Sequence, residues 1–287
     1  MSYHTLQHLV VRMLFDPAFV STVYQNPDKT LANLNLTEQE KKQLLAIDPR
    51  AWNYDPLLRL RTMRSLVEEF KVSATLVLSE TRRLSFLENF FSSEIFHQFI
   101  QDRKSMALAF AEYLSTAISK SELTTPQLND VLRLETLMAR CRRDLANKIR
   151  IPTLPEKLNE NLRVRLIPGA DVGAFQANTV ATIQAVEKYL FEVSLMPAMV
   201  LCDDAPRLEN LPKVEPKKKV YLFCLPGANG VSLVDIDRLD YLVLIEARTT
   251  LTIRQIIERA LASGVTRAKA QEIIATALEE QTLYLNQ

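Results

Sequence analysis

Apolar residues over positions 1–150 recur at the spacing of amphipathic helices. Between residues 3 and 15, Leu6, Val10, Met13 and Leu14 fall on one face of a helix. The same spacing predicts further helices over 17–25, 37–47, 55–79, 94–100, 104–119 and from Thr125 to about 145. Prolines separate several of these segments, since proline disfavours helix at the residue before it. We therefore expect a helical domain over 1–150.

A local motif specifies the start of one of these helices. Thr37 and Glu40 have the spacing of a capping box. In that motif the threonine side chain accepts a hydrogen bond from the Glu40 amide, and the Glu40 side chain accepts one from the Thr37 amide. We therefore expect the helix over 37–47 to begin at this threonine.

The pattern changes after residue 150. Two prolines within 151–160 indicate a linker. The alternation of 162–168 predicts a strand, the spacing over 178–191 predicts a helix, and the apolar run 197–202 favours another strand. We assign 151–219 to a linker with a connecting strand and helix.

The remaining residues predict a small domain over 220–287. Two strand-like runs, 220–225 and 231–235, flank Asn229-Gly230, a dipeptide typical of a hairpin turn. Three helices are expected next, over 237–247, 252–263 and 266–281, with Gly264 and Thr266 as cap residues. A hairpin with three short helices is typical of a winged helix–turn–helix domain. The predicted fold class is mainly α with a small β component (α+β).

Composition and motifs exclude several classes of enzyme. The chain has 287 residues and only 5 Gly, and it contains neither GxGxxG nor GxxxxGK[ST], the phosphate-binding signatures. It also lacks GxSxG, so a serine-hydrolase elbow has no support. The formal net charge is +1, so the chain does not have the excess of basic residues that is typical of a dedicated nucleic-acid-binding protein.

The cysteines favour a reducing compartment. Cys141, Cys202 and Cys224 are odd in number, lie far apart and form no CxxC pair. That usage is unlike a secreted disulfide scaffold. The first residues lack the pattern of a signal peptide, and no apolar run reaches the ~18 residues of a membrane span. We therefore expect a cytoplasmic protein without a membrane partner.

The histidines give little support for catalysis or metal binding. His4 and His8 are four residues apart, a spacing that zinc sites use, but Thr5 stands where an HExxH motif requires glutamate. His97 lies in an aromatic helical stretch, where a packed histidine is the simpler interpretation. We predict no catalytic residue and no metal ligand in this chain.

Basic residues gather in two places and leave the class of partner open. One group ends a helix and the other precedes the hairpin: Arg140, Arg142, Arg143, Lys148 and Arg150, then Lys213, Lys217, Lys218 and Lys219. Such groups complement a helix end, solvate a linker, or bind an anionic partner such as an acidic peptide or a nucleic acid. A DNA-binding transcription regulator is therefore the alternative function. The third helix of the 220–287 domain carries Arg267 and Lys269 but also Glu272, which weakens phosphate contact.

Several apolar motifs resemble those of known families. The stretch from Val220 to Glu280 resembles the winged-helix recognition domains that capture precursor peptides of ribosomally made natural products. The run from Phe90 to Phe99, then Leu108–Leu114 and Val131–Glu135, resembles the helical half of the partner subunits of multinuclear non-haem iron oxidases. A short match over 36–52 is similar to the small helical subunit of aromatic-ring-opening dioxygenases. Together these motifs most resemble the partner subunits of 3-thiaglutamate peptide biosynthesis.

The resemblance implies a division of labour between two subunits. This chain would hold no cofactor and perform no catalysis, while the iron would lie in an oxidase subunit with which it forms a heterodimer. It would bind a ribosomal precursor peptide by β-augmentation and present it for cysteine-directed oxidative modification. The helical domain would dock the oxidase. The implied peptide-binding residues are Val231, Ser232, Leu233 and Val234 on the second hairpin strand, and Arg267, Ala270, Gln271 and Ile274 on the third helix.

Overall fold

The fold is mainly helical with two small antiparallel sheets, as the sequence predicts. The computed structural model describes residues 2–53, 57–102, 105–145, 159–194, 208–227 and 230–286. The chain divides into two compact units, Met1–Leu128 and Asn129–Gln287. The division therefore falls before the last helix that the sequence assigned to the 1–150 domain.

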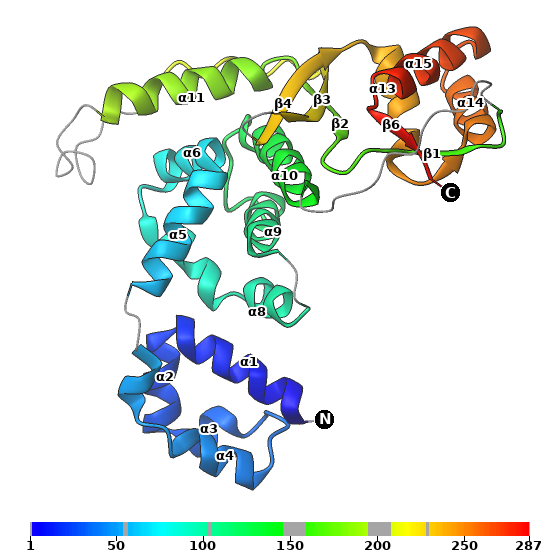
Figure 1. The fold of residues 1–287 in the computed structure, drawn as a ribbon. Helices are drawn as coiled ribbons and strands as arrows, with labels where there is room; N and C mark the ends of the chain where they lie inside the picture. The colour runs from blue at the N-terminus through cyan, green and yellow to red at the C-terminus, as the bar shows by residue number, and fades with distance from the viewer. Residues whose placement is uncertain are drawn as a thin grey trace. The chain divides into compact units, whose positions relative to one another are not determined.

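The first unit is built of helices (Figure 1). They are α1 (Ser2–Phe15), α2 (Pro17–Gln25), α3 (Pro27–Leu31), α4 (Glu38–Leu45), η1 (Pro49–Asn53), α5 (Leu58–Glu69), α6 (Lys71–Thr81), α7 (Leu84–Glu88), η2 (Asn89–Ser92), α8 (Glu94–Gln101) and α9 (Met106–Ser119). The capping box at Thr37 and Glu40 is confirmed, with both reciprocal hydrogen bonds present. The single helix expected over 55–79 is wrong. The chain leaves helical geometry at Phe70 (φ −111°, ψ 47°), and this break accompanies full burial of its ring against Phe110.

Two apolar clusters hold the first unit together. Helices α1 to α4 and η1 surround one of them, where Trp52 donates from its indole Nε1 to the Tyr24 hydroxyl at 2.9 Å. The other is an aromatic cluster in which the rings of Phe15, Phe90, Phe91 and Phe96 lie 5.1–5.5 Å apart, mostly edge to face. Edge-to-face rings gain stability beyond their buried area. This cluster fixes α8 against α1.

The second unit contains both sheets. Its elements are α10 (Leu128–Asp144), β1 (Arg163–Leu166), β2 (Asp171–Gln176), α11 (Thr179–Ser194), β3 (Lys219–Gly227), β4 (Gly230–Ile236), α13 (Arg238–Leu244), η3 (Glu246–Arg248), β5 (Leu251–Thr252), α14 (Ile253–Ala262), α15 (Arg267–Glu279) and β6 (Leu283–Leu285). The strands pair in the orders β5-β1-β6 and β2-β3-β4, and every pairing is antiparallel.

The hairpin and the three helices expected over 220–287 are confirmed in kind and order. Thr266 caps α15 by accepting from the Lys269 amide, and Gly264 has the positive φ of +88° expected after a helix. However, the compact unit starts well before residue 220, because β1 and β2 complete the two sheets. The strand expected over 197–202 lies outside the described residues.

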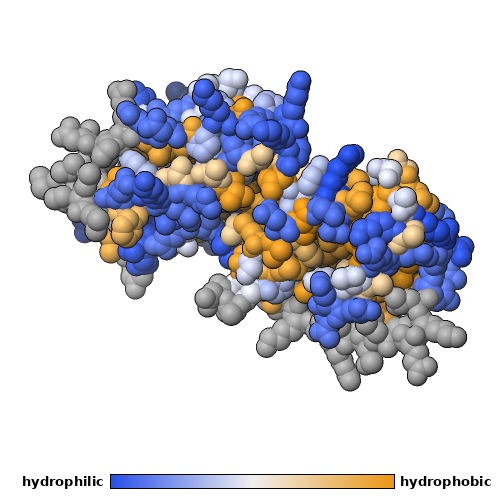
Figure 2. All heavy atoms as spheres, turned by 90° about the horizontal axis from the view of Figure 1, so that it is seen from above, coloured by the Kyte–Doolittle hydropathy of each residue, from blue (hydrophilic) through white to orange (hydrophobic). Residues whose placement is uncertain are grey.

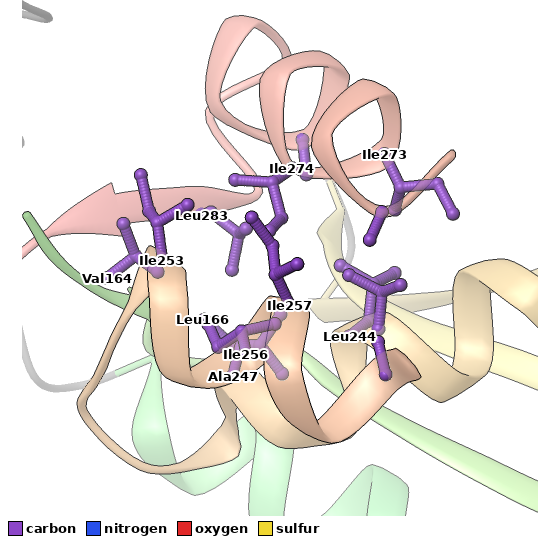
Figure 3. Packing of buried hydrophobic residues seen from close by; sticks show 14 of the residues in the cluster. Val164, Leu166, Leu244, Ala247, Ile253, Ile256, Ile257, Ile273, Ile274 and Leu283 are labelled. Atoms are coloured by element: carbon purple, nitrogen blue, oxygen red, sulfur yellow. The ribbon is translucent and has the colours of Figure 1, made fainter. Parts of the chain in front are cut away.

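Apolar side chains cover both faces of the β2–β3–β4 sheet. On one face Phe223 joins a large cluster formed mainly by α13, α14, α15, β1 and β6, part of which Figure 3 shows. On the other face Leu134 and Cys141 of α10 pack against Phe175 and Cys224. Close packing also explains Gly173, since a Cβ there would lie 2.4 Å from the Phe175 ring. Because other elements pack on both of its faces, the strand edges are the parts of this sheet at which another strand could be added. No helix in the described parts of the chain is both long and apolar enough to cross a bilayer.

Candidate functional site

Side chains cover one edge of the β2–β3–β4 sheet. At the outer edge of β2, groups from α10 and η3 satisfy the backbone atoms that have no partner strand. The contacts are Arg248 to the Val172 carbonyl, Arg133 Nη2 to the Ala174 carbonyl at 3.2 Å, and the Gln176 amide to Asp130 Oδ2 at 2.8 Å. These side chains use outward carbonyl and amide groups along β2, so they compete with the addition of another strand at this edge.

The opposite edge, β4, is open. Antiparallel residues alternate between bonded and non-bonded pairs, and the register of β2, β3 and β4 leaves the backbone N–H and C=O of Val231, Leu233 and Asp235 directed away from β3. Within the described part of the chain, no group bonds to these outward atoms. An edge with unused donors and acceptors is a template for an added strand.

The two faces beside β4 present different surfaces to such a strand. Val231 and Leu233 are partly buried against the α10 cluster. Val234 projects from the other face and remains 46% exposed. Figure 2 shows that hydrophobic (orange) residues also lie at the surface among hydrophilic (blue) ones elsewhere on the face seen from above. An added strand would place alternate side chains on each of these faces.

A groove lies between the sheet and helices α13 and α15. It has a volume of about 280 Å³ and adjoins the C-terminal end of β4 through Ile236. Polar and charged residues line it together with apolar ones: Asp240, Lys269, Glu272, Thr276, Glu280 and Thr282 beside Phe223, Leu244, Ile273 and Ala277. Its apolar floor and charged rim are suited to a side chain with an apolar stem and a polar tip.

The charges of the groove favour a positively charged guest. Burial, followed by the charge of Asp237, raises the pKa of Asp240 above its ordinary value. Lys269 is already paired with Glu272 at 3.0 Å. With that lysine paired, Asp240 and Glu280 give the groove a net negative character. A lysine or arginine of a bound peptide would relieve the repulsion at Asp240.

The four residues expected on the third helix do not line this groove. Ala270 and Ile274 are buried in the apolar cluster, at 0% and 1% exposure. Arg267 and Gln271 instead contact Glu160, with Arg267 Nη2 2.8 Å from both carboxylate oxygens and Gln271 Nε2 3.1 Å from one. Their part in peptide binding stays a prediction. Val231, Ser232, Leu233 and Val234 do lie together on the open edge strand.

Sequence reasoning missed the residues of α15 that face the groove. Lys269, Glu272, Ile273 and Thr276 lie on the face adjoining the predicted one. The helical period was correct, but it does not show which side of an amphipathic helix meets a sheet. The clue in the sequence was the pair of adjacent isoleucines, Ile273 and Ile274. Both are buried in the core, and Ile273 also borders the groove.

No protein-family model matches the chain, and no curated protein matches it. We therefore infer what the chain binds from the residues of the edge and the groove.

The remaining candidate residues fall into three situations. Cys141 and Cys224 are buried together, and the hydrogen bond between their thiols, with burial, raises the pKa of Cys141 far above its ordinary value. Cys202, Lys148 and Arg150 lie outside the described residues, as does the side chain of His4. His8 and His97 line one pocket in the first unit. Among the described residues, no three histidine, cysteine, aspartate or glutamate side chains are grouped to hold a metal ion.

The two basic groups are exposed where the structure describes them. Arg140, Arg142 and Arg143 extend from the last turns of α10. Lys213, Lys217, Lys218 and Lys219 are exposed before and at the start of β3, and Lys218 pairs with Glu215. Neither group lines the groove beside β4.

Proposed function

We propose that this chain is a non-catalytic partner subunit that binds an extended precursor peptide along β4. It presents the peptide to an iron-dependent oxidase for cysteine-directed oxidative modification. The observation that carries the proposal is the contrast between the two edges of one sheet, since side chains close β2 while β4 keeps its outward groups unused. The oxidase partner follows from the resemblance of the helical motifs.

Binding would use the backbone for affinity and the side chains for selectivity. The outward N–H and C=O groups of Val231, Leu233 and Asp235 would pair with alternate residues of the peptide. Peptide side chains between those positions would face the α10 side or the groove side of the sheet. The acidic groove then selects peptides with a lysine or arginine near the end of β4.

The geometry of α15 favours a peptide over DNA. A recognition helix reads DNA with free cationic and amide side chains near its start. Here Arg267 is bonded to Glu160 and Lys269 to Glu272, while Gln271 also donates to Glu160. Cations already paired with carboxylates neutralise few phosphates, so this arrangement supports the peptide function more than a DNA-binding regulator.

A proline substitution tests strand addition directly. Leu233→Pro removes the outward N–H at the centre of β4, and edge strands tolerate proline because this N–H has no partner in the sheet. Leu233→Ala removes the side chain and keeps the N–H, so it is the matched control. Fluorescent synthetic peptides, tiled across the short reading frames beside the gene, serve as probes in anisotropy titrations of the full-length protein. We expect binding to be lost in Leu233→Pro and largely kept in Leu233→Ala.

Two further observations decide the proposal. Circular dichroism must show that both variants are folded. Equal loss of binding in both would assign the effect to the leucine side chain and refute strand addition. Co-expression with the neighbouring genes should yield a complex whose iron follows the second subunit. If the chain instead purifies without a second subunit and binds DNA with an affinity that falls steeply with salt, the alternative of a DNA-binding transcription regulator would be supported.

A further inference from the structure

Strand β4 carries few of the features that keep an edge strand from pairing with other chains. Proteins protect such edges with lysines, prolines, bulges or covering elements. The strand contains neither lysine nor proline, and its register with β3 runs from Ile236 to Gly230 without a bulge. Asp235 is its one charged residue. The edge is therefore a template for any strand whose donors and acceptors match its own.

The outward groups of β4 are arranged symmetrically about Leu233, so the strand can pair with a copy of itself. Val231, Leu233 and Asp235 direct their N–H and C=O groups away from β3, and Leu233 lies midway between the other two. When a second β4 lies antiparallel with its Leu233 opposite the first, Val231 of each copy lies opposite Asp235 of the other. Each of these pairs then exchanges both of its N–H···O bonds. Shifting one strand by two residues leaves one of the three without a partner in the ladder.

The side chains and charges of β4 are compatible with this register. Asp235 of one copy lies opposite Val231 of the other, so the two Asp235 carboxylates are about 13 Å apart along the strands. This separation exceeds the Debye length of about 8 Å at physiological salt, so their repulsion is weak. On the other face Ser232 lies opposite Val234, whose side chain is 46% exposed in the single chain and becomes partly covered. A formal net charge of +1 adds little repulsion between whole copies.

We propose that two copies of this chain associate by antiparallel pairing of their β4 strands, centred on Leu233. The pairing covers the edge while no peptide is bound, and a peptide that adds to β4 must displace the second copy. This competition rests on the proposed function, whereas the pairing of the copies rests on the edge alone. The contact is confined to one strand of each copy, and small interfaces, below about 1,200 Å², are typical of weak and transient association.

Sedimentation velocity of the full-length protein tests this pairing. Concentrations from about 5 to 500 μM cover the range of a weak dimer. The decisive variants change Ser232 and Val234, which are both exposed and lie opposite each other across the contact. Ser232→Glu/Val234→Glu places like charges opposite each other at two points, whereas Ser232→Glu/Val234→Lys places opposite charges there. We expect a concentration-dependent dimer of the wild type, and a dimer of the like-charge variant that is at least about tenfold weaker than that of the opposite-charge variant.

The control for net charge is Ala262→Glu/Ala268→Glu, which adds two carboxylates at exposed positions of the same unit. It should dimerise like the wild type, and circular dichroism shows whether each variant is folded. A wild type that stays monomeric at the highest concentration, or equal dimerisation of the two charged β4 variants, would overturn the proposal.

The same measurements separate this inference from the proposed function. Peptide binding by a chain that stays monomeric would overturn the pairing and leave the proposed function standing. A dimer that responds to the charges at 232 and 234 as expected, in a chain that binds none of the tiled peptides, would support the pairing and refute the proposed function. Where both occur, a bound peptide should dissociate the dimer, and a dimer that persists with the peptide bound would overturn the shared use of β4.

Discussion

Acidification should destabilise the first unit through His97. Its imidazole is almost buried, and the charge of Arg12 stands in the same pocket, so the protonated form is disfavoured in the folded state. The pKa is about 4 when folded, compared with an ordinary value of 6.5. The unfolded state therefore binds more protons between these two values. Stability due to this group is fully present above pH 6.5 and is lost as the pH falls toward 4.

The size of the effect follows from the shift. Each pKa unit corresponds to about 1.36 kcal/mol, so the full shift would give roughly 3 kcal/mol. The pocket is open to solvent, which screens the charge, and we expect about 1–3 kcal/mol over the window. His8 and Arg12 oppose protonation and Asp16 favours it, so these three set where in that range the value falls.

Urea unfolding followed by tryptophan fluorescence measures this loss. Trp52 is the single tryptophan, and it is 8% exposed within the core of the first unit, so its emission reports that unit. The wild type and His97→Phe are compared between pH 7 and pH 4. The wild type should lose about 1–3 kcal/mol more than the variant across this window. Parallel pH profiles for the two proteins would refute the reasoning, because carboxylates titrate in both.

Two further predictions concern the second unit. Asp130→Ala should destabilise the protein by about 1–3 kcal/mol in urea unfolding. The change removes the buried carboxylate that accepts a hydrogen bond from the Gln176 amide, so this amide loses its partner. Asp144→Ala, an exposed change on the same helix, should have almost no effect, and equal losses would contradict the edge contact. Cys141 and Cys224 should resist maleimide in the folded protein and react in urea, since burial and a raised pKa keep Cys141 protonated. Fast labelling of both by mass spectrometry without denaturant would contradict their burial.

Local signals account for the parts of the fold that the sequence predicts well. The Thr37–Glu40 box, the turn at Gly230 and the cap at Thr266 each depend on residues close in sequence. Strand β2 was missed because Gly173 and Ala174 lower its β-propensity and both of its faces are packed, so no alternation appears.

Contacts between distant residues account for what the sequence did not predict. The helix over 128–144 is amphipathic, but periodicity does not show that one of its faces packs on a sheet. The edge strand lies where the sequence predicts it, whereas residues of α15 other than the predicted Arg267 and Gln271 line the groove, and these two pair with Glu160 from a distant segment. The sequence does not predict the pocket that His97 lines for the same reason, since most of its lining residues come from α1 and α8, which are far apart in the chain.

The β5–β1–β6 sheet also sets an order of events during synthesis. Its central strand, Arg163–Leu166, is made long before its neighbour at Leu283–Leu285. Synthesis from residue 166 to residue 283 takes roughly six seconds or more at ~5–20 residues per second, and pairings of such separation form slowly. A strand without its neighbours can pair with strands of other chains and start aggregation, and charged side chains on the strand disfavour such pairing. Arg163 and Arg165 are exposed and alternate with buried Val164, so β1 carries two such charges on one of its faces.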